Sequence, residues 1–146
     1  MRVHTQPCGD SDAQEHWVDT IENKVPISRI QTHLTQNDLD TFPDTPQSEF
    51  AVWGVTNGKK DVNKNKWETM SPGDLILLYR KKRFFQAGKI IFKTHNENLA
   101  KELWGSSADG ETWENIFLDG RIQRDCQVMQ HLAPSQFCYH AAAFTG

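Results

Sequence analysis

The chain is 146 residues long, 37% hydrophobic, 10% aromatic and 24% charged, with a formal net charge of −3. This length fits one compact domain and leaves little room for a second. No run of 18 apolar residues occurs and the N-terminal stretch MRVHTQPCGDSD lacks an apolar segment, so neither a membrane span nor a Sec-type leader is expected. Cys8, Cys126 and Cys138 are too few for a disulfide framework, which predicts reduced thiols in a cytoplasmic protein.

Charge is distributed unevenly along the chain. Residues 1–50 hold 3 Lys/Arg against 9 Asp/Glu, residues 51–100 hold 10 against 4, and residues 101–146 hold 3 against 6. A strong nonspecific nucleic-acid binder usually has a basic pI over the whole domain, whereas the pI here is about 6.0. The basic middle third therefore predicts a local basic face, with simple solvated turns as the alternative.

The first part of the chain is mostly polar. Residues 1–15 are acidic and lack apolar periodicity, which predicts a disordered lead before a single domain over residues 16–146. In residues 16–21, Trp17 and Ile21 lie an even number of residues apart, as side chains on one face of a strand do, which predicts a short strand. Residues 25–34 have approximately helical spacing, with Pro26 permitted in the first turn.

Apolar, β-rich runs dominate the middle of the chain. Strands are predicted at residues 50–55, 75–79 and 84–92. A loop rich in Asn, Gly and Lys is predicted over residues 56–66, and an Arg/Lys turn joins the second strand to the third.

A helix and further strands are predicted in the last third. Asn96 is a suitable N-cap for a helix over residues 97–104, with Gly105 at its C-terminal end. Residues 112–123 predict one or two strands, and the tail over residues 126–146 has no clear assignment. Together these elements predict an α+β fold, a small curved sheet or partly closed β-barrel with flanking helices.

Motifs for catalysis and metal binding are not found. Residues 54–60 read G-V-T-N-G-K-K, which has too few residues between the glycines for a P-loop and lacks the Ser/Thr after Lys. The spacing of Cys126, His131, Cys138 and His140 matches no common zinc site. No Gly-x-Ser-x-Gly nucleophile elbow occurs. A non-catalytic protein without a metal or cofactor is therefore expected.

Five tryptophans are many for this length. Trp53 precedes a glycine loop, Trp104 ends the predicted helix and Trp113 follows a turn. Aromatic rings beside a basic loop are what a nucleobase pocket requires, because a base offers π faces and a polar edge. Stacking of about 1–3 kcal/mol per base roughly offsets the cost of flipping a base, so cationic contacts to the backbone must supply the surplus. Core filling is the alternative for each tryptophan.

An ordered series of short motifs resembles the EVE and YTH group of the PUA-like superfamily. The motifs are FAVWGVT at residues 50–56, NKWE at 65–68, PGD at 72–74, FFQAG at 84–88, HNENLAKELWG at 95–105 and TWENIFL at 112–118. The similarity covers roughly residues 16–123 and is greatest to the modified-base-recognition modules of modification-dependent restriction enzymes. Such a resemblance implies a PUA-like barrel whose aromatic cage holds one flipped or unpaired modified base.

The resemblance assigns roles to individual residues. Trp53 and Trp104 are the implied cage aromatics, and Trp113 is a weaker candidate with a core position as its alternative. Polar partners of the base are implied at Thr20 and Asn23.

The basic middle third supplies the predicted backbone contacts. We expect Lys64, Lys66 and Arg83 to contact phosphates, and Trp67 to be a packing residue. The leading hypothesis is a reader of a methylated or hydroxymethylated base in DNA, serving a restriction or defence system with a possible nuclease partner. The alternatives are an RNA-binding PUA-like module, a small enzyme acting on nucleotides or RNA through a residue such as His95, and a protein-interaction domain.

Overall fold

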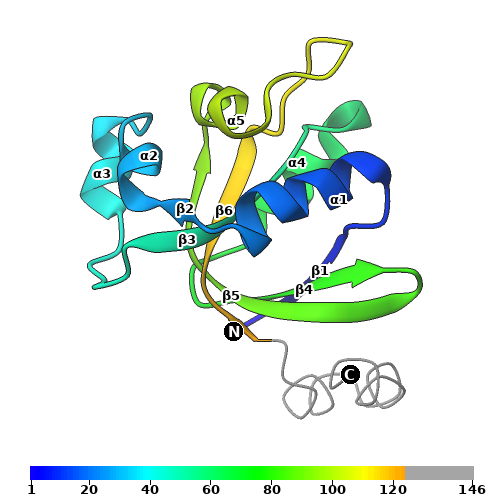
Figure 1. Cartoon of the computed structure of the whole chain (residues 1–146), viewed down its shortest axis with the longest axis horizontal. Coiled ribbons are helices and arrows are strands. Elements are labelled where there is room, and N and C mark those ends of the chain that lie inside the picture. The colour runs from blue at the N-terminus through cyan, green and yellow to red at the C-terminus, as the bar shows by residue number, and fades with distance from the viewer. Residues whose placement is uncertain (124–146) are drawn as a thin grey trace.

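The structure, a computed structural model, describes residues 1–123, so the unassigned tail over residues 126–146 lies outside the described residues (Figure 1). The strands are β1 (Val3–Pro7), β2 (Val25–Pro26), β3 (Glu49–Val55), β4 (Leu75–Arg80), β5 (Arg83–His95) and β6 (Asn115–Gln123). The helices are α1 (Ser11–Trp17), the π-helical turn η1 (Val18–Glu22), α2 (Ile27–Gln31), α3 (Gln36–Thr41), the 3₁₀ turn η2 (Lys59–Asp61), α4 (Val62–Glu68) and α5 (Glu97–Trp104).

The strands form one six-stranded sheet in the order β1-β4-β5-β6-β3-β2. β1 runs parallel to β4, and the other neighbouring pairs are antiparallel. The predicted α+β class is confirmed. The sheet is open, with β1 and β2 as its edges, and it is not a closed barrel.

The long strand β5 gives the sheet its curvature. Its first half pairs with β4 and its second half pairs with β6. The β5–β6 register shifts twice between Gly88 and Phe92, and such irregularities bend a strand and increase its twist. The bend places β4 and β6 on different parts of one strand, as Figure 1 shows.

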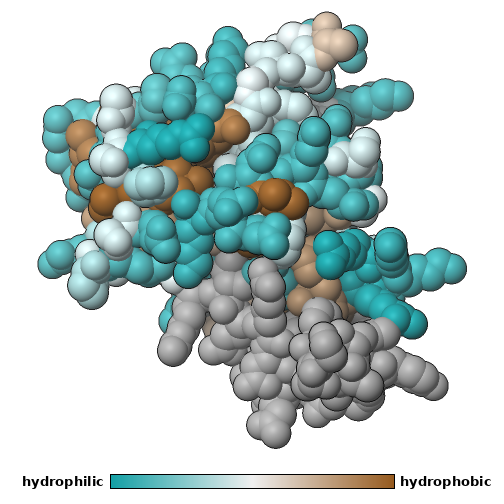
Figure 2. Space-filling view, viewed as in Figure 1, coloured by the Kyte–Doolittle hydropathy of each residue, from teal (hydrophilic) through white to brown (hydrophobic). Residues whose placement is uncertain are grey.

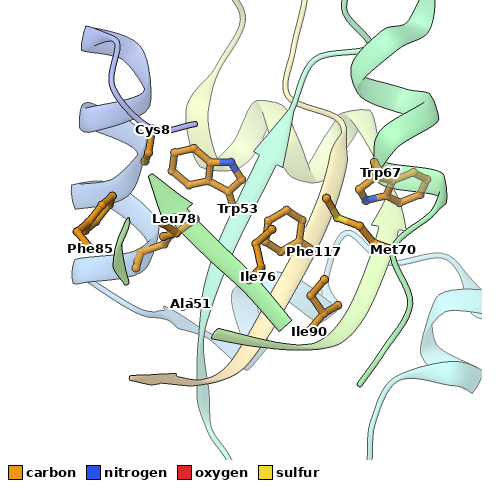
Figure 3. Packing of buried hydrophobic residues seen from close by; sticks show 11 residues of the cluster. Cys8, Ala51, Trp53, Trp67, Met70, Ile76, Leu78, Phe85, Ile90 and Phe117 are labelled. Carbon is orange, nitrogen blue, oxygen red and sulfur yellow. The ribbon is translucent and has the colours of Figure 1, made fainter. Parts of the chain in front are cut away.

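Both faces of the sheet are covered by helices. In β3, Ala51 and Trp53 belong to the apolar cluster beneath α1, η1 and α4, while Phe50 and Val52 belong to the cluster beneath α2 and α5. This alternation follows from the two-residue period of a strand. Figure 3 shows part of the first cluster, which contains Trp53.

The face of the molecule seen in Figure 2 is mainly hydrophilic where it is coloured. On the face seen in Figure 2, apolar side chains show in separate areas, the largest over α2 and α3. Within residues 1–123, none of the helices combines the length and apolar character needed to cross a bilayer.

The prediction that residues 1–15 form a disordered lead is wrong. Val3–Pro7 forms β1, which adds to the sheet beside β4. The carboxylate of Asp74 fixes the start of this strand, accepting from the Arg2 backbone N–H at 2.9 Å and from His4 Nε2 at 2.9 Å. These bonds, with Arg2 contributing most, hold the pKa of Asp74 well below its usual range. The strand was missed because its binding relies on backbone bonds and one carboxylate rather than on apolar alternation.

The strand predicted at residues 16–21 is also wrong. Asp10 caps α1 through Oδ1, which accepts from the Ala13 N–H at 2.7 Å, and the helix continues into η1. Trp17 and Ile21 share the parity of a strand, but a spacing of four residues equally suits one face of a helix.

The other elements differ mainly in their lengths. The helix expected over residues 25–34 is shorter, because Val25–Pro26 pairs with β3 before α2 begins. The loop expected over residues 56–66 contains α4, whose surface is polar and whose anchor is the buried Trp67. The strands predicted around β3, β4 and β5 are confirmed.

The last part of the predicted domain is close to the observed structure. The α5 helix is confirmed together with its cap, since Asn96 Oδ1 accepts from the Leu99 N–H at 2.8 Å. Gly105 ends this helix with φ +73°, a conformation that favours glycine. Residues 112–123 contribute one strand, β6.

Candidate functional site

A pocket of about 470 Å³ lies between α1, α4 and the loop after α5. Small-ligand sites usually enclose about 300–1,000 Å³, so this volume suits one small planar ligand. Among residues 1–123, those that line the pocket come from the end of β1, from α1, from the end of β3, from α4 and from residues 107–113. Four rings line it: His16, Trp53, Trp67 and Trp113.

Trp53 is the most enclosed of these rings. It extends from β3 into the apolar cluster and is 3% exposed. Figure 3 shows its indole between α1 and α4, with the nitrogen on the side facing α4. Among residues 1–123, no group accepts a hydrogen bond from its Nε1. A buried donor without a partner is rare in folded proteins and calls for an explanation.

His16 links two tryptophans beside the pocket. Its ring stacks on Trp104 with centroids 5.4 Å apart and meets Trp113 edge-on at 4.2 Å. Burial lowers the pKa of the His16 imidazole below its ordinary value, which favours the neutral ring at physiological pH. His16 was not singled out in the sequence, because the segment was assigned to a strand. A helical assignment would place it on the same face as the buried Thr20.

Trp104 is not among the pocket residues. It lies behind His16, and its Nε1 also lacks a partner among the described residues. Gly54 allows this arrangement, because a Cβ there would lie 2.6 Å from Trp104 Cζ3 and would also collide with the carbonyl oxygen of Trp113. The glycine of the VWG motif therefore lets β3 pass close to the Trp104 ring and to the Trp113 backbone.

Thr20 and Asn23, the predicted polar partners of a base, do not line the pocket. The buried Thr20 hydroxyl lies 2.6 Å from the Val52 carbonyl and 3.0 Å from that of His16, so it joins the helical segment to β3. Asn23 is exposed, and its Nδ2 donates to the Val18 carbonyl at 2.8 Å. Both side chains have structural contacts at η1.

The predicted phosphate-binding residues are not gathered at one place. Lys66 lines the pocket, donates from Nζ to the Thr5 carbonyl, and has its pKa lowered by burial. Lys64 is half-buried on the same helix but outside the lining. Arg83 lies in the β4–β5 hairpin, next to two turn residues with positive φ, and is not a pocket residue.

Trp67 has the packing role expected for it and also forms part of the wall. It is 8% exposed, and its Nε1 donates to the Ile116 carbonyl at 3.0 Å. The Lys93 ammonium lies 4.3 Å from its ring centroid and donates to the carbonyls of Trp67 and Glu68 at the end of α4. This contact fixes the wall formed by α4.

A buried polar network supports the loop that leaves β3. Asn115, which is fully buried, donates from Nδ2 to the Val55 carbonyl at 3.1 Å and to Asn57 Oδ1 at 2.8 Å. Its Oδ1 lies 2.7 Å from His95 Nδ1, so the network assigns the donor role to that nitrogen. This bond holds the His95 ring beside Asn115. Nothing in the sequence marks Asn115 beyond its place in the TWENIFL motif.

Within residues 1–123, no group of three or more His, Cys, Asp or Glu side chains is placed to hold a metal ion. Cys126, His131, Cys138 and His140 lie outside the described residues. Comparisons of the chain with protein-family models, with curated proteins and with solved structures give no match. Chemically, the pocket offers aromatic faces and, among residues 1–123, two buried groups without a partner, the Trp53 N–H and the Ser107 hydroxyl. This combination suits a planar ligand with an acceptor on its edge.

Proposed function

We propose that this chain is a non-catalytic reader of a modified nucleobase, which binds one flipped or unpaired base of DNA in the pocket between α1 and α4. One observation carries the proposal: the buried N–H of Trp53, a residue that lines an aromatic pocket, lacks a partner in the part of the chain that the structure describes. Leaving a buried donor unpaired costs about 1–3 kcal/mol. A ring nitrogen or carbonyl on the edge of a base would remove that cost.

The aromatic walls supply the second requirement of base binding. Trp113 is half-buried at the pocket, and His16 packs against its ring. Stacking on such a ring contributes about 1–3 kcal/mol per base whatever the base is. Discrimination of a modified base from its unmodified form then depends on steric fit, since one methyl group contributes only about 0.8 kcal/mol of burial.

Two motifs of the EVE and YTH resemblance support the same proposal. FAVWGVT carries Trp53 and Gly54, TWENIFL carries Trp113, and these distant segments come together at the pocket. The PUA-like assignment, a role in restriction or defence, and a nuclease partner acting in trans are parts of the proposal that rest on this resemblance. The Lys-rich segment that includes Lys64 and Lys66 is the proposed contact for phosphates.

The test is a titration with single-stranded and duplex oligonucleotides of one sequence, unmodified or carrying one methylated or hydroxymethylated base. We expect a modified strand to bind more tightly than the unmodified one and to quench tryptophan fluorescence. Trp113→Ala should weaken that binding by about 5- to 150-fold, which is the loss of one stacking contact.

The matched control is Trp17→Ala, which truncates a half-buried tryptophan that packs on Phe85 outside the pocket lining. This variant should keep the affinity of the wild type, and circular dichroism should show that both variants are folded. Unchanged affinity in Trp113→Ala would overturn the pocket assignment. Equal binding of all strands that vanishes as salt rises would reduce the protein to a basic surface.

A further inference from the structure

The described lining of the pocket carries an excess of negative charge. Four carboxylates border it, two from the start of α1 and two from the loop after α5: Asp10, Asp12, Asp109 and Glu111. Among residues 1–123 that line the pocket, Lys66 is the one cation, and its Nζ is already bound to the Thr5 carbonyl. Four carboxylates and one ammonium leave a net formal charge of −3 on the lining.

The ring of His16 does not compensate this charge. Burial lowers its pKa, so the imidazole is neutral at physiological pH. The carboxylates that face it belong to Asp10, Asp12, Glu15 and Asp19 on its own helical segment, and their opposing effect on the pKa is smaller than that of burial. From the packed elements, Trp104 and Trp113 present only aromatic rings to it. The pocket therefore keeps its negative field at neutral pH.

The aromatic walls strengthen the attraction for a cation. The face of a tryptophan ring attracts a positive charge, and the attraction is stronger when the pair is desolvated. The Trp67 ring is already occupied by the Lys93 ammonium, 4.3 Å from its centroid, so the rings left for a ligand cation are those of Trp53 and Trp113. The unpartnered N–H of Trp53 independently indicates that a ligand with an edge acceptor occupies the pocket.

From these observations we infer that the base read by this pocket carries a positive charge, as bases alkylated on a ring nitrogen do. A base methylated on carbon or on an exocyclic amine is neutral and gains nothing from the four carboxylates. The inference rests on the proposed base-reading function and names the chemical class of its ligand. The phosphates of the bound strand then lie on the side of α4, away from Asp109 and Glu111.

The experiment compares bases that carry one methyl group at different positions, so that at neutral pH one member of each pair is protonated and cationic while the other is neutral. Single-stranded oligonucleotides of one sequence carry 1-methyladenine or N6-methyladenine, and 3-methylcytosine or 5-methylcytosine, at one position. We expect the first member of each pair, which is cationic, to bind about tenfold more tightly at low salt, because the carboxylates and the ring faces both attract its charge. Because the phosphates are the same in both strands, the affinity ratio reports on the base alone.

A charge variant and a matched control test the origin of that ratio. Asp109→Asn with Glu111→Gln should reduce the preference for the cationic isomer severalfold, and both side chains are exposed, so the fold does not depend on them. Glu22→Gln with Asp44→Asn neutralises two exposed carboxylates outside the pocket lining and should leave the ratio unchanged.

The outcomes separate this inference from the proposed function. Equal affinity for both isomers, above that for the unmodified strand and dependent on Trp113, would overturn the charge preference and leave base reading intact. Equal affinity for all strands, modified or not, would overturn both. A cationic preference that persists at full size in the pocket double variant would overturn the electrostatic origin argued here, because the carboxylates of Asp109 and Glu111 could not then contribute to it.

Discussion

Four buried side-chain polar atoms lack a partner among residues 1–123, and two of them, Trp53 Nε1 and Ser107 Oγ, belong to residues that line the pocket. Trp53 Nε1 and Asp119 Oδ1 both lack a partner among residues 1–123. Trp53 lines the pocket, where a ligand can satisfy its N–H, whereas Asp119 lies in β6 outside the lining. Asp119 is 3% exposed, and burial raises its pKa to about 8. A protonated carboxyl avoids a buried charge, so proton uptake explains Asp119 without a ligand.

Asp119 should make folding depend on pH. The folded pKa of about 8 exceeds the ordinary value of 3.8, so between these values the folded state holds a proton that the unfolded state has lost. The free energy of unfolding contributed by this group is fully present below pH 3.8 and is lost as the pH rises through 8, with a slope of about −1.4 kcal/mol per pH unit between.

Urea unfolding of the wild type and of Asp119→Asn over this range measures the effect. The difference between the two proteins should follow that slope, because the amide cannot ionise and other titrating groups contribute equally to both. Parallel pH profiles for the two proteins would show that Asp119 does not bind a proton in the folded state. The side chain of Asp119 is closely packed against β5, because a Cβ at Gly88 would lie 2.6 Å from Asp119 Oδ2.

At the scale of elements, the pocket depends on how closely β3 approaches the loop after α5. Gly54 ends the buried part of β3, beside the Trp104 ring and the backbone carbonyl of Trp113. The Asn115 network holds the next turn of the chain, because it binds the Val55 carbonyl and Asn57. The backbone of β3 therefore forms one side of the pocket. The rings of His16 and Trp113, which contact each other edge-on, form another part of its wall.

Gly54→Ala should disturb both the fold and the site. The added methyl group must displace Trp104 and the Trp113 backbone, and overpacking of this kind typically costs about 1–3 kcal/mol. We expect the free energy of unfolding to fall by this amount and the affinity for the modified strand to fall with it.

Gly9→Ala is the matched control, because a Cβ at that glycine meets no atom within 4 Å. Its stability in urea and its affinity should match those of the wild type within error. Wild-type affinity in Gly54→Ala would show that the rings above β3 do not shape the binding site.

Elements with strong local signals could be predicted from the sequence. In α5, the Asn96 cap, the buried Leu99 and Leu103, and the terminal Gly105 all agree, so its boundaries were recovered. The helix over Ser11–Trp17 was not predicted, because the spacing of four residues between Trp17 and Ile21 fits a strand as well. Strand β1 could not be found by periodicity, since tertiary contacts with β4 and Asp74 hold it.

For the whole molecule, the site joins segments that the sequence keeps apart. Trp53 and Trp113 were singled out as separate aromatics, and folding brings both to one pocket. His16, Asp109 and Glu111 were not singled out, because nothing local marks them as neighbours of Trp53. The uneven charge along the chain also has a different interpretation in the folded protein. The acidic flanks contribute side chains to the pocket, beside the basic segment of the middle third.

The indole N–H signals of the tryptophans test the central claim most directly. In a ¹⁵N-labelled protein titrated with the modified strand, the Trp53 indole signal, assigned from its loss in Trp53→Phe, should move downfield as its N–H gains an acceptor. The Trp17 and Trp67 indoles already donate to Gln86 and Ile116 and should move little. Binding of the strand with no change at Trp53 or Trp113 would contradict base reading by this pocket.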